Sequence, residues 1–224
     1  PPAMNILILG ASRGIGLEFV RQYRAAGDTV TATARDAAGL QAIDALGAKA
    51  LRLDVTDAAS IAGLGRQLAA GKLDLALYVA GVNSRGGATQ PPSQDDFDRT
   101  MRTNVLGAMQ AIPLVAPLVE AAGGKFVFIS SRMGRIAEVE SSYSWVYRAS
   151  KAALNMAVAA AQPDYPKAIF VAMNPGWVQT DMGGAGAPLL VPDSVAAMRD
   201  AIAGITPADQ GRFLNYDGQR FESW

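Results

Sequence analysis

Short apolar segments alternate with longer alanine- and leucine-rich segments along this chain of 224 residues. The short segments have the composition of strands that are buried on both faces of a parallel sheet. They are Asn5–Leu9, Thr29–Ala34, Ala48–Leu53, Leu73–Val79, Lys125–Ile129, Ala168–Met173 and Arg212–Asn215. The longer segments have helical length and are Gly14–Ala26, Ala37–Leu46, Ala58–Ala69, Asp95–Ala121, Trp145–Ala161 and Pro192–Ala203. This alternation predicts an α/β fold, with a doubly wound, seven-stranded parallel sheet and helices on both faces.

The composition excludes several classes of function. Half of the residues are hydrophobic and 18% are charged, which indicates a packed globular protein. Lysine plus arginine (20) equals aspartate plus glutamate (20), so no net charge attracts nucleic acid or an acidic membrane. The chain contains neither cysteine nor histidine, which excludes disulfides, thiolate and histidine metal sites, and a Ser-His-Asp triad. We therefore expect no metal and no nucleic-acid partner.

The ends of the chain and its linkers add little. The first apolar run, Ile6–Leu9, is too short for a signal peptide, and no apolar run approaches the roughly 18–20 residues that span a bilayer. Residues Pro1 to Ala3 precede Met4 and could be an expression remnant. No repeat or linker divides the chain, so we interpret residues 1–224 as one domain of a cytoplasmic protein without a membrane partner.

Tyr147 and Lys151 stand four residues apart in the predicted helix Trp145–Ala161. Residues at this spacing lie on one helix face, which brings the ammonium beside the phenol. A phenol ordinarily loses its proton near pH ~10, and a neighbouring cation lowers that pKa. The pair therefore predicts a tyrosine that works as an acid or base near neutral pH, although the motif alone also occurs by chance.

A glycine-rich turn follows the first predicted strand and precedes a helix. Its glycines permit a tight turn and let the backbone approach a pyrophosphate, which then meets the amides at the helix N-terminus. The spacing is G-x-x-x-G-x-G. The turn predicts nucleotide binding by Gly10, Ser12, Arg13, Gly14, Ile15 and Gly16.

Together, this turn and the Tyr147/Lys151 pair resemble the short-chain dehydrogenase/reductase (SDR) family over essentially the whole chain. Further matching motifs are Asp54-Val55, Ala80-Gly81, Asn104, Ser131 and the segment from Asn174 to Thr180. The resemblance implies a Rossmann fold and an oxidoreductase that transfers hydride between a nicotinamide and a small carbonyl or alcohol substrate. Residues 175–184 and 211–218 resemble a narrower branch, which contains the C-factor and sniffer-like carbonyl reductases.

The resemblance also implies roles for individual residues. The catalytic set is Asn104, Ser131, Tyr147 and Lys151. Tyr147 would exchange the proton, Ser131 would bind the substrate oxygen, Lys151 would lower the tyrosine pKa and bind the ribose, and Asn104 would hold a relay water. The further cofactor-binding residues are Asp54, Val55, Ala80, Gly81, Tyr147, Lys151, Pro175, Gly176, Val178 and Thr180. Two alternatives stay open: Ser130 could point inward in place of Ser131, and Asn104 could be a polar residue that kinks its helix.

Two features depart from the family pattern. Val79 stands where the family usually has an asparagine, which raises the question of what braces the strand there. The spacing between Ser131 and Tyr147 is longer than usual, so Glu138–Trp145 is predicted to form a loop over the substrate pocket. The glycine-rich segment Met182–Val191 is predicted to be a mobile lid. Its apolar character favours an uncharged carbonyl substrate.

The end of the second predicted strand bears on the choice of cofactor. Ala34 occupies the position where NAD enzymes of the family carry an aspartate, and Arg35 follows it. Arginines in this position and in the glycine turn, such as Arg13, can bind a 2′-phosphate. Asp36 could instead bind a ribose hydroxyl if the strand ended later. The pair of arginines favours NADP(H) over NAD(H).

Two other functions compete with this interpretation. The C-factor-like branch includes proteins associated with signalling, so the chain could be a cofactor-binding regulatory protein with little turnover. The intact set of four catalytic residues argues against that alternative. An epimerase or dehydratase of the extended SDR branch would need a longer chain. The family often forms homodimers or homotetramers, and the sequence leaves the oligomeric state open.

Overall fold

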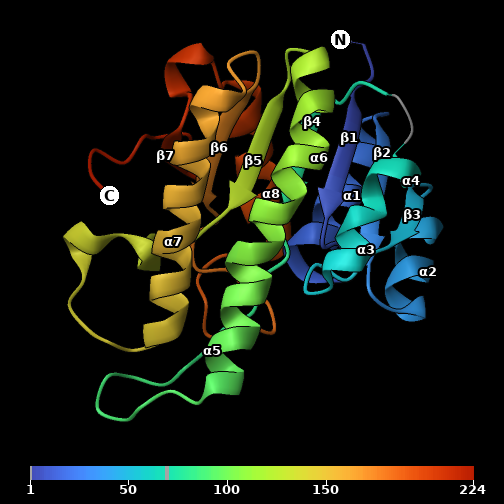
Figure 1. The fold of residues 1–224 in the computed structure, drawn as a ribbon. Helices are drawn as coiled ribbons and strands as arrows, with labels where there is room; N and C mark the ends of the chain where they lie inside the picture. Colours follow the sequence, from blue (N-terminus) through green and yellow to red (C-terminus); the bar gives the residue numbers. More distant parts are fainter. Residues whose placement is uncertain (1, 69–70) are drawn as a thin grey trace.

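Seven parallel strands form one sheet in the order β3-β2-β1-β4-β5-β6-β7 (Figure 1). This computed structural model describes residues 2–68 and 71–224, so Pro1 and the predicted helix end at Ala69 lie outside it. The strands are β1 (Asn5–Leu9), β2 (Thr29–Ala34), β3 (Lys49–Arg52), β4 (Leu75–Tyr78), β5 (Lys125–Ile129), β6 (Ile169–Asn174) and β7 (Arg212–Asn215). The order reverses between β1 and β4, and ligands bind at such a switch point in open α/β sheets. The predicted fold class is confirmed.

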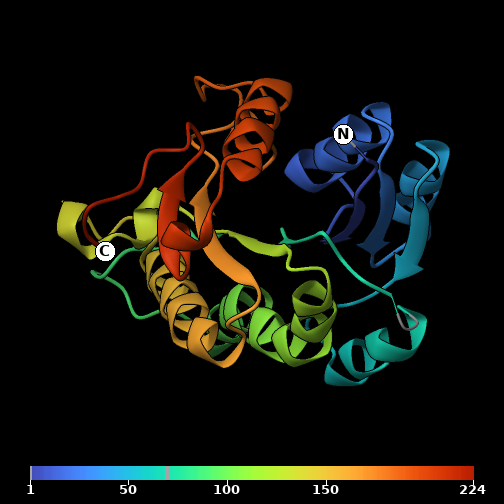
Figure 2. The ribbon, with the colours of Figure 1, turned by 90° about the horizontal axis from the view of Figure 1, so that it is seen from above.

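Helices cover both faces of the sheet (Figure 2). One face carries α1 (Gly14–Ala25), α2 (Ala37–Ala45) and α8 (Val191–Ala203). The other carries α3 (Ala58–Ala62), α4 (Leu64–Gln67), α5 (Gln94–Met101), α6 (Gly107–Ala121) and α7 (Trp145–Ala161). Five short segments complete the described chain: the π turn η1 (Arg102–Leu106) and the 3₁₀ turns η2 (Arg132–Gly134), η3 (Ile136–Glu138), η4 (Gln162–Asp164) and η5 (Pro207–Asp209). The single helix predicted from Ala58 is therefore two short helices that meet at Gly63.

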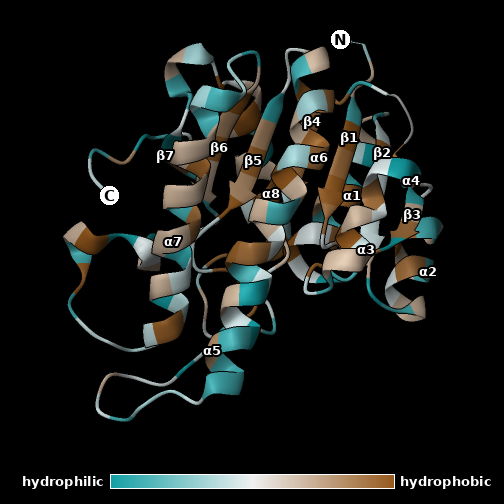
Figure 3. Ribbon diagram, viewed as in Figure 1, coloured by the Kyte–Doolittle hydropathy of each residue, from teal (hydrophilic) through white to brown (hydrophobic). Residues whose placement is uncertain are grey.

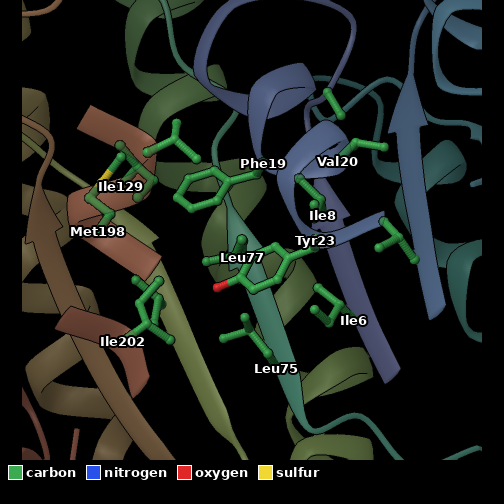
Figure 4. Close-up of a cluster of buried hydrophobic side chains, with 14 of the residues drawn as sticks. Ile6, Ile8, Phe19, Val20, Tyr23, Leu75, Leu77, Ile129, Met198 and Ile202 are labelled. Carbon is green, nitrogen blue, oxygen red and sulfur yellow. The ribbon is translucent and has the colours of Figure 1, made fainter. Parts of the chain in front are cut away.

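The strands are the most apolar elements because both of their faces are buried (Figure 3). In β1, Ile6 and Ile8 join the core under α1 and α8, which also contains Phe19 and Met198 (Figure 4). Leu7 and Leu9 point to the opposite core, under α6 and α7. Successive side chains of a strand alternate in this way, so each strand supports both layers of helices.

The helical run Gln94–Ala121 is long and apolar enough to cross a membrane by length and composition alone. Half of its most apolar window is buried inside the protein. Ala108, Val115 and Val119 are fully buried against the sheet. The apolar character of this run is therefore accounted for by its place in the core.

The sequence predicted one regular helix for this run, Asp95–Ala121, but the structure shows two helices. The π turn at Arg102–Leu106 separates α5 from α6 and carries the buried Asn104. The Tyr78 hydroxyl, at the end of β4, donates a hydrogen bond to the Thr103 carbonyl oxygen inside this turn (2.6 Å). A Cβ on Gly107 would lie 2.4 Å from the same hydroxyl, so only glycine leaves room for the contact. This contact fixes the π turn against the sheet.

We expect Tyr78→Phe to lower the free energy of unfolding by about 1–3 kcal/mol, because the buried Thr103 carbonyl would lose its partner. Urea denaturation measures this change. Tyr165→Phe is the matched control, since the Tyr165 ring stacks on Phe170 and its hydroxyl makes no hydrogen bond to the described residues. If both variants lost the same free energy of unfolding, the hydrogen bond of the Tyr78 hydroxyl would make no specific contribution to stability.

Candidate active site

A cavity of about 510 Å³ opens at the carboxyl ends of the strands. These ends face the lower edge of the sheet in Figure 1, where the loops after β4, β5 and β6 gather. The lining includes most of the predicted cofactor residues: Gly10, Ser12, Arg13, Gly14, Ile15, Gly16, Arg35, Asp54, Val55, Ala80, Gly81, Tyr147, Lys151, Pro175 and Thr180. Gly176 and Val178, also predicted, lie outside the lining. The structure thus brings fifteen of these positions to one cavity.

The glycine turn is held by close backbone contacts. Gly10 has a φ of +92°, and a Cβ there would lie 2.6 Å from the Ala80 nitrogen. A Cβ on Gly16 would lie 2.0 Å from the Gly10 carbonyl oxygen. The turn therefore needs glycine at both positions. It leaves the first residues of α1 along the cavity, where helix N-terminal amides attract a phosphate.

Ser131 and Tyr147 meet at the inner part of the site. Tyr147 is only 8% exposed, and burial raises the pKa of its phenol. A hydrogen bond from the Ser131 side chain opposes that rise in pKa. The neighbouring Ser130 donates instead to the buried Asn155 amide oxygen (2.6 Å). Ser130 lines the cavity, but its hydroxyl is bound to Asn155, and the hydrogen bond to the phenol comes from Ser131.

The sequence predicted that Lys151 lowers the pKa of Tyr147, and the structure of the protein alone differs from this prediction. Its ammonium donates to the Ile129 carbonyl oxygen at 3.1 Å and lies 5.7 Å from the centre of the Tyr147 ring. Burial lowers the pKa of Lys151 to about 8. In the protein alone the pKa of Tyr147 is raised and not lowered, because burial of the phenol outweighs the opposing hydrogen bond from Ser131.

Asn104 braces the loop after β4. Its side chain accepts from the Val82 amide (2.8 Å) and donates to the Val82 carbonyl (2.9 Å) and the Ser150 hydroxyl (3.0 Å). Val79, which replaces the family's asparagine, keeps its strand in place through a backbone bond to Leu9 (2.9 Å). The backbone and Asn104 therefore brace the end of β4 and the loop after it, although Val79 replaces the asparagine. The Asn104 side-chain oxygen accepts one hydrogen bond and can accept a second, so the predicted relay water stays a prediction.

Lys151 provides a test of the site electrostatics in the protein without cofactor. The folded protein releases this proton near pH 8, whereas the unfolded chain holds it to about pH 10.4. Stability should therefore rise with pH between these values, because the unfolded state binds more protons. We expect the wild type to gain about 2 kcal/mol relative to Lys151→Met between pH 7 and pH 9.5, measured by urea unfolding. Parallel pH dependence in both proteins would contradict the lowered pKa.

The end of the cavity that was predicted to bind the adenosine carries arginines. Arg35 lines the cavity, and Arg52 donates to the Arg35 carbonyl oxygen (2.8 Å). Asp36 instead caps the N-terminus of α2, where its carboxylate accepts from the Gly39 amide (2.8 Å). Arg13 forms an exposed ion pair with Asp181 across the cavity (3.3 Å). Asp36, the residue that could instead bind a ribose hydroxyl, is thus already hydrogen-bonded to its own helix.

A cluster of charged and aromatic side chains around Arg135, in the loop after Ser131, was not predicted from the sequence. Arg135 is 7% exposed, forms an ion pair with Glu138, and donates to the Ser223 carbonyl oxygen (3.0 Å). Its guanidinium also lies over the Phe221 ring, 4.5 Å from the ring centre. Both arginines bound to Glu138, Arg135 and Arg132, lower the pKa of that carboxyl to about 2. The cluster fastens residues 221–224 to the loop that follows the serine.

The predicted loop before Tyr147 lies along the loop after β4. Trp145 donates its backbone amide to the Gly86 carbonyl (2.9 Å), and Ala88 donates to the Ser142 hydroxyl (3.0 Å). Ser144 caps α7 in a left-handed conformation (φ 57°), which is uncommon for residues other than glycine. Two loops distant in sequence therefore form one wall beside the first turn of the helix that carries Tyr147.

Comparison with known proteins agrees with this geometry. Residues 4–187 match the family model for short chain dehydrogenases. The chain belongs to the short-chain dehydrogenase family. It is 39% identical to C-signal of Myxococcus xanthus over 151 residues, which cover 66% of this chain and 91% of C-signal.

Solved structures of the family are similar over the full length of both chains. Carbonyl reductase Sniffer of D. melanogaster superposes with a TM-score of 0.90 at 25% identity. A short-chain dehydrogenase/reductase from Burkholderia multivorans with bound NADP gives 0.87 at 30% identity. The predicted resemblance to the family and to its sniffer-like branch is therefore confirmed.

Proposed function

We propose that this short-chain dehydrogenase is an NADP(H)-dependent oxidoreductase that interconverts a carbonyl compound and its alcohol. The observation that carries the proposal is the placement of Tyr147 and Lys151 in one cavity with the glycine turn, with Ser131 hydrogen-bonded to the phenol. The bound cofactor would supply or accept the hydride. The chain's own residues would supply the proton and bind the substrate oxygen.

The properties of Tyr147 suit the direction of reduction. Its raised pKa keeps the phenol protonated at neutral pH, so it holds the proton that a carbonyl oxygen needs. Ser131 can donate to the same oxygen and stabilise the charge that develops on it. Lys151, with a pKa of about 8, remains largely cationic at pH 7 and can bind a ribose hydroxyl. Tyr147 and Lys151 are both buried, at 8% and 4% exposed, which shields these two groups from water.

Similarity to C-signal favours one alternative, a regulatory protein that binds the cofactor with little turnover. Such a protein would need the glycine turn and the cavity. It would not need a protonated, buried Tyr147 in contact with Ser131. Turnover by the wild type and its dependence on Tyr147 therefore separate the two functions.

Tyr147→Phe should reduce the rate of carbonyl reduction by about 10²–10⁴-fold, the usual contribution of a general acid. The ring would keep its contacts, so NADPH affinity should change little. Rates with a panel of aldehydes, ketones, diketones and quinones, together with fluorescence titration of NADPH, measure both quantities. A variant that retains more than about a tenth of the wild-type rate would place the proton donor elsewhere.

The preference for NADP(H) rests on the charges at the adenosine end. Arg35 and Arg13 line the cavity, and two guanidinium groups suit a 2′-phosphate. Asp36 would have to leave the Gly39 amide to bind a ribose hydroxyl. Breaking a helix cap typically costs about 1 kcal/mol, which disfavours NAD(H) further.

Arg35→Ala should weaken NADPH binding by at least tenfold, which corresponds to about 1.4 kcal/mol, and leave NADH binding nearly unchanged. Fluorescence titration of both cofactors measures the ratio. Arg66→Ala, on the exposed surface of α4, controls for a general loss of positive charge. Tighter binding of NADH by the wild type, unaffected by the loss of Arg35, would make Asp36 the ribose-binding residue.

A further inference from the structure

Arg85 occupies a fixed position beside the catalytic helix. Its carbonyl oxygen accepts from the Ser144 amide (3.4 Å), and the next carbonyl, of Gly86, accepts from Trp145 (2.9 Å). These contacts attach the loop after β4 to the N-terminus of α7. Tyr147 lies in the first turn of that helix. The backbone of Arg85 is therefore attached to the turn of α7 that carries Tyr147.

The side chain of Arg85 joins two further segments around the site. Its Nη1 donates to the Tyr143 hydroxyl (3.1 Å), and its Nη2 donates to the Met182 carbonyl oxygen (3.3 Å). Met182 lines the same cavity as Tyr147. The guanidinium thus lies where the loop before α7 meets the segment after Thr180, next to Met182 of the cavity lining.

Arg85 forms no ion pair within residues 2–68 and 71–224. Both of its acceptors are neutral oxygens. Arg148, the residue after Tyr147, likewise donates to a neutral atom, the Tyr143 carbonyl oxygen (2.6 Å). Three acidic side chains of these segments are already bound to arginines: Asp96 of α5 to Arg99, Glu138 to Arg132 and Arg135, and Asp181 to Arg13. Glu140, in the loop before α7, forms no ion pair within residues 2–68 and 71–224. Two positive charges at this wall therefore lack a carboxylate partner in the described chain.

We propose that Arg85 is a specificity-determining residue, which binds a carboxylate carried by the carbonyl substrate. An arginine has five N–H donors, of which the structure uses two, so donors remain for a carboxylate. Charge-assisted hydrogen bonds of this kind are about twice as strong as neutral ones. The inference rests on the proposed carbonyl reduction and replaces the expectation of an uncharged substrate.

Apolar side chains around Arg85 define the rest of the substrate. Tyr143 is 51% exposed, Trp145 is 44% exposed and Met182 is 37% exposed. Large apolar groups exposed together often mark a binding surface. The substrate class is therefore an oxo acid with an aromatic or otherwise apolar body, oriented by its carboxylate toward Arg85.

Two aldehydes of similar shape test the proposal: 4-carboxybenzaldehyde, which is anionic, and the neutral 4-methylbenzaldehyde. We expect Arg85→Gln to lower the anionic-to-neutral ratio of kcat/KM about tenfold, through KM of the anionic aldehyde. Arg85→Lys should restore part of this ratio, because a lysine keeps the charge without the fork of donors. Arg212→Gln, an exposed arginine on the edge strand β7, is the control and should leave the ratio unchanged.

Equal loss with both aldehydes, or no loss with either, would overturn the proposal, since Arg85 would then only hold the loops together. A binding measurement keeps this test separate from the proposed reaction. Benzoate and benzamide are titrated by tryptophan fluorescence, with Trp145 as a reporter beside Gly86. Benzoate binding that Arg85→Gln alone abolishes supports the anion site even if no aldehyde is reduced, an outcome that would overturn the reductase function. Failure of the wild type to prefer benzoate to benzamide would overturn the anion site.

Discussion

The burial of two titratable groups at the end of β5 shapes this site more than any other interaction. Lys151 is 4% exposed and Tyr147 is 8% exposed. Burial moves both toward their neutral forms, lowering the pKa of the lysine and raising that of the tyrosine. The folded protein gives up stability to keep a charged lysine there. Such a cost is typical of a site whose pKa values serve chemistry.

The fold was predictable because a buried parallel strand leaves a plain signature in sequence. Four predicted strands, among them β1 and β5, match the structure residue for residue. The π turn at Arg102–Leu106 could not be predicted in this way, since one extra residue in a helical turn leaves no mark on an apolar pattern. The direction of the shift in the Tyr147 pKa was predicted wrongly for a different reason. The spacing of two residues along a helix shows that they are close but not that they are buried, and burial determines whether the pKa rises or falls.

The contacts around the substrate were also beyond the sequence. Arg85 and Met182 lie 97 positions apart, and Arg135 and Ser223 lie 88 apart, so no local pattern joins them. By contrast, the capping role of Asp36 was local and could have been read from its place before the helix that begins at Ala37. The roles predicted for the catalytic residues stay predictions, although the structure gathers Ser131, Tyr147 and Lys151 into one place.

The cofactor and substrate ends of the cavity converge on two adjacent residues. Asp181 pairs with Arg13 of the glycine turn, and the Met182 carbonyl accepts from Arg85. The ion pair is exposed on both sides, at 77% and 83%, so it contributes at most about 1 kcal/mol. A 2′-phosphate would compete with Asp181 for Arg13, and a substrate carboxylate would compete with Met182 for Arg85. Each ligand would therefore loosen one attachment of the segment from residue 181 onward and replace it with a contact of its own. By this reasoning the segment is poised to respond to both ligands.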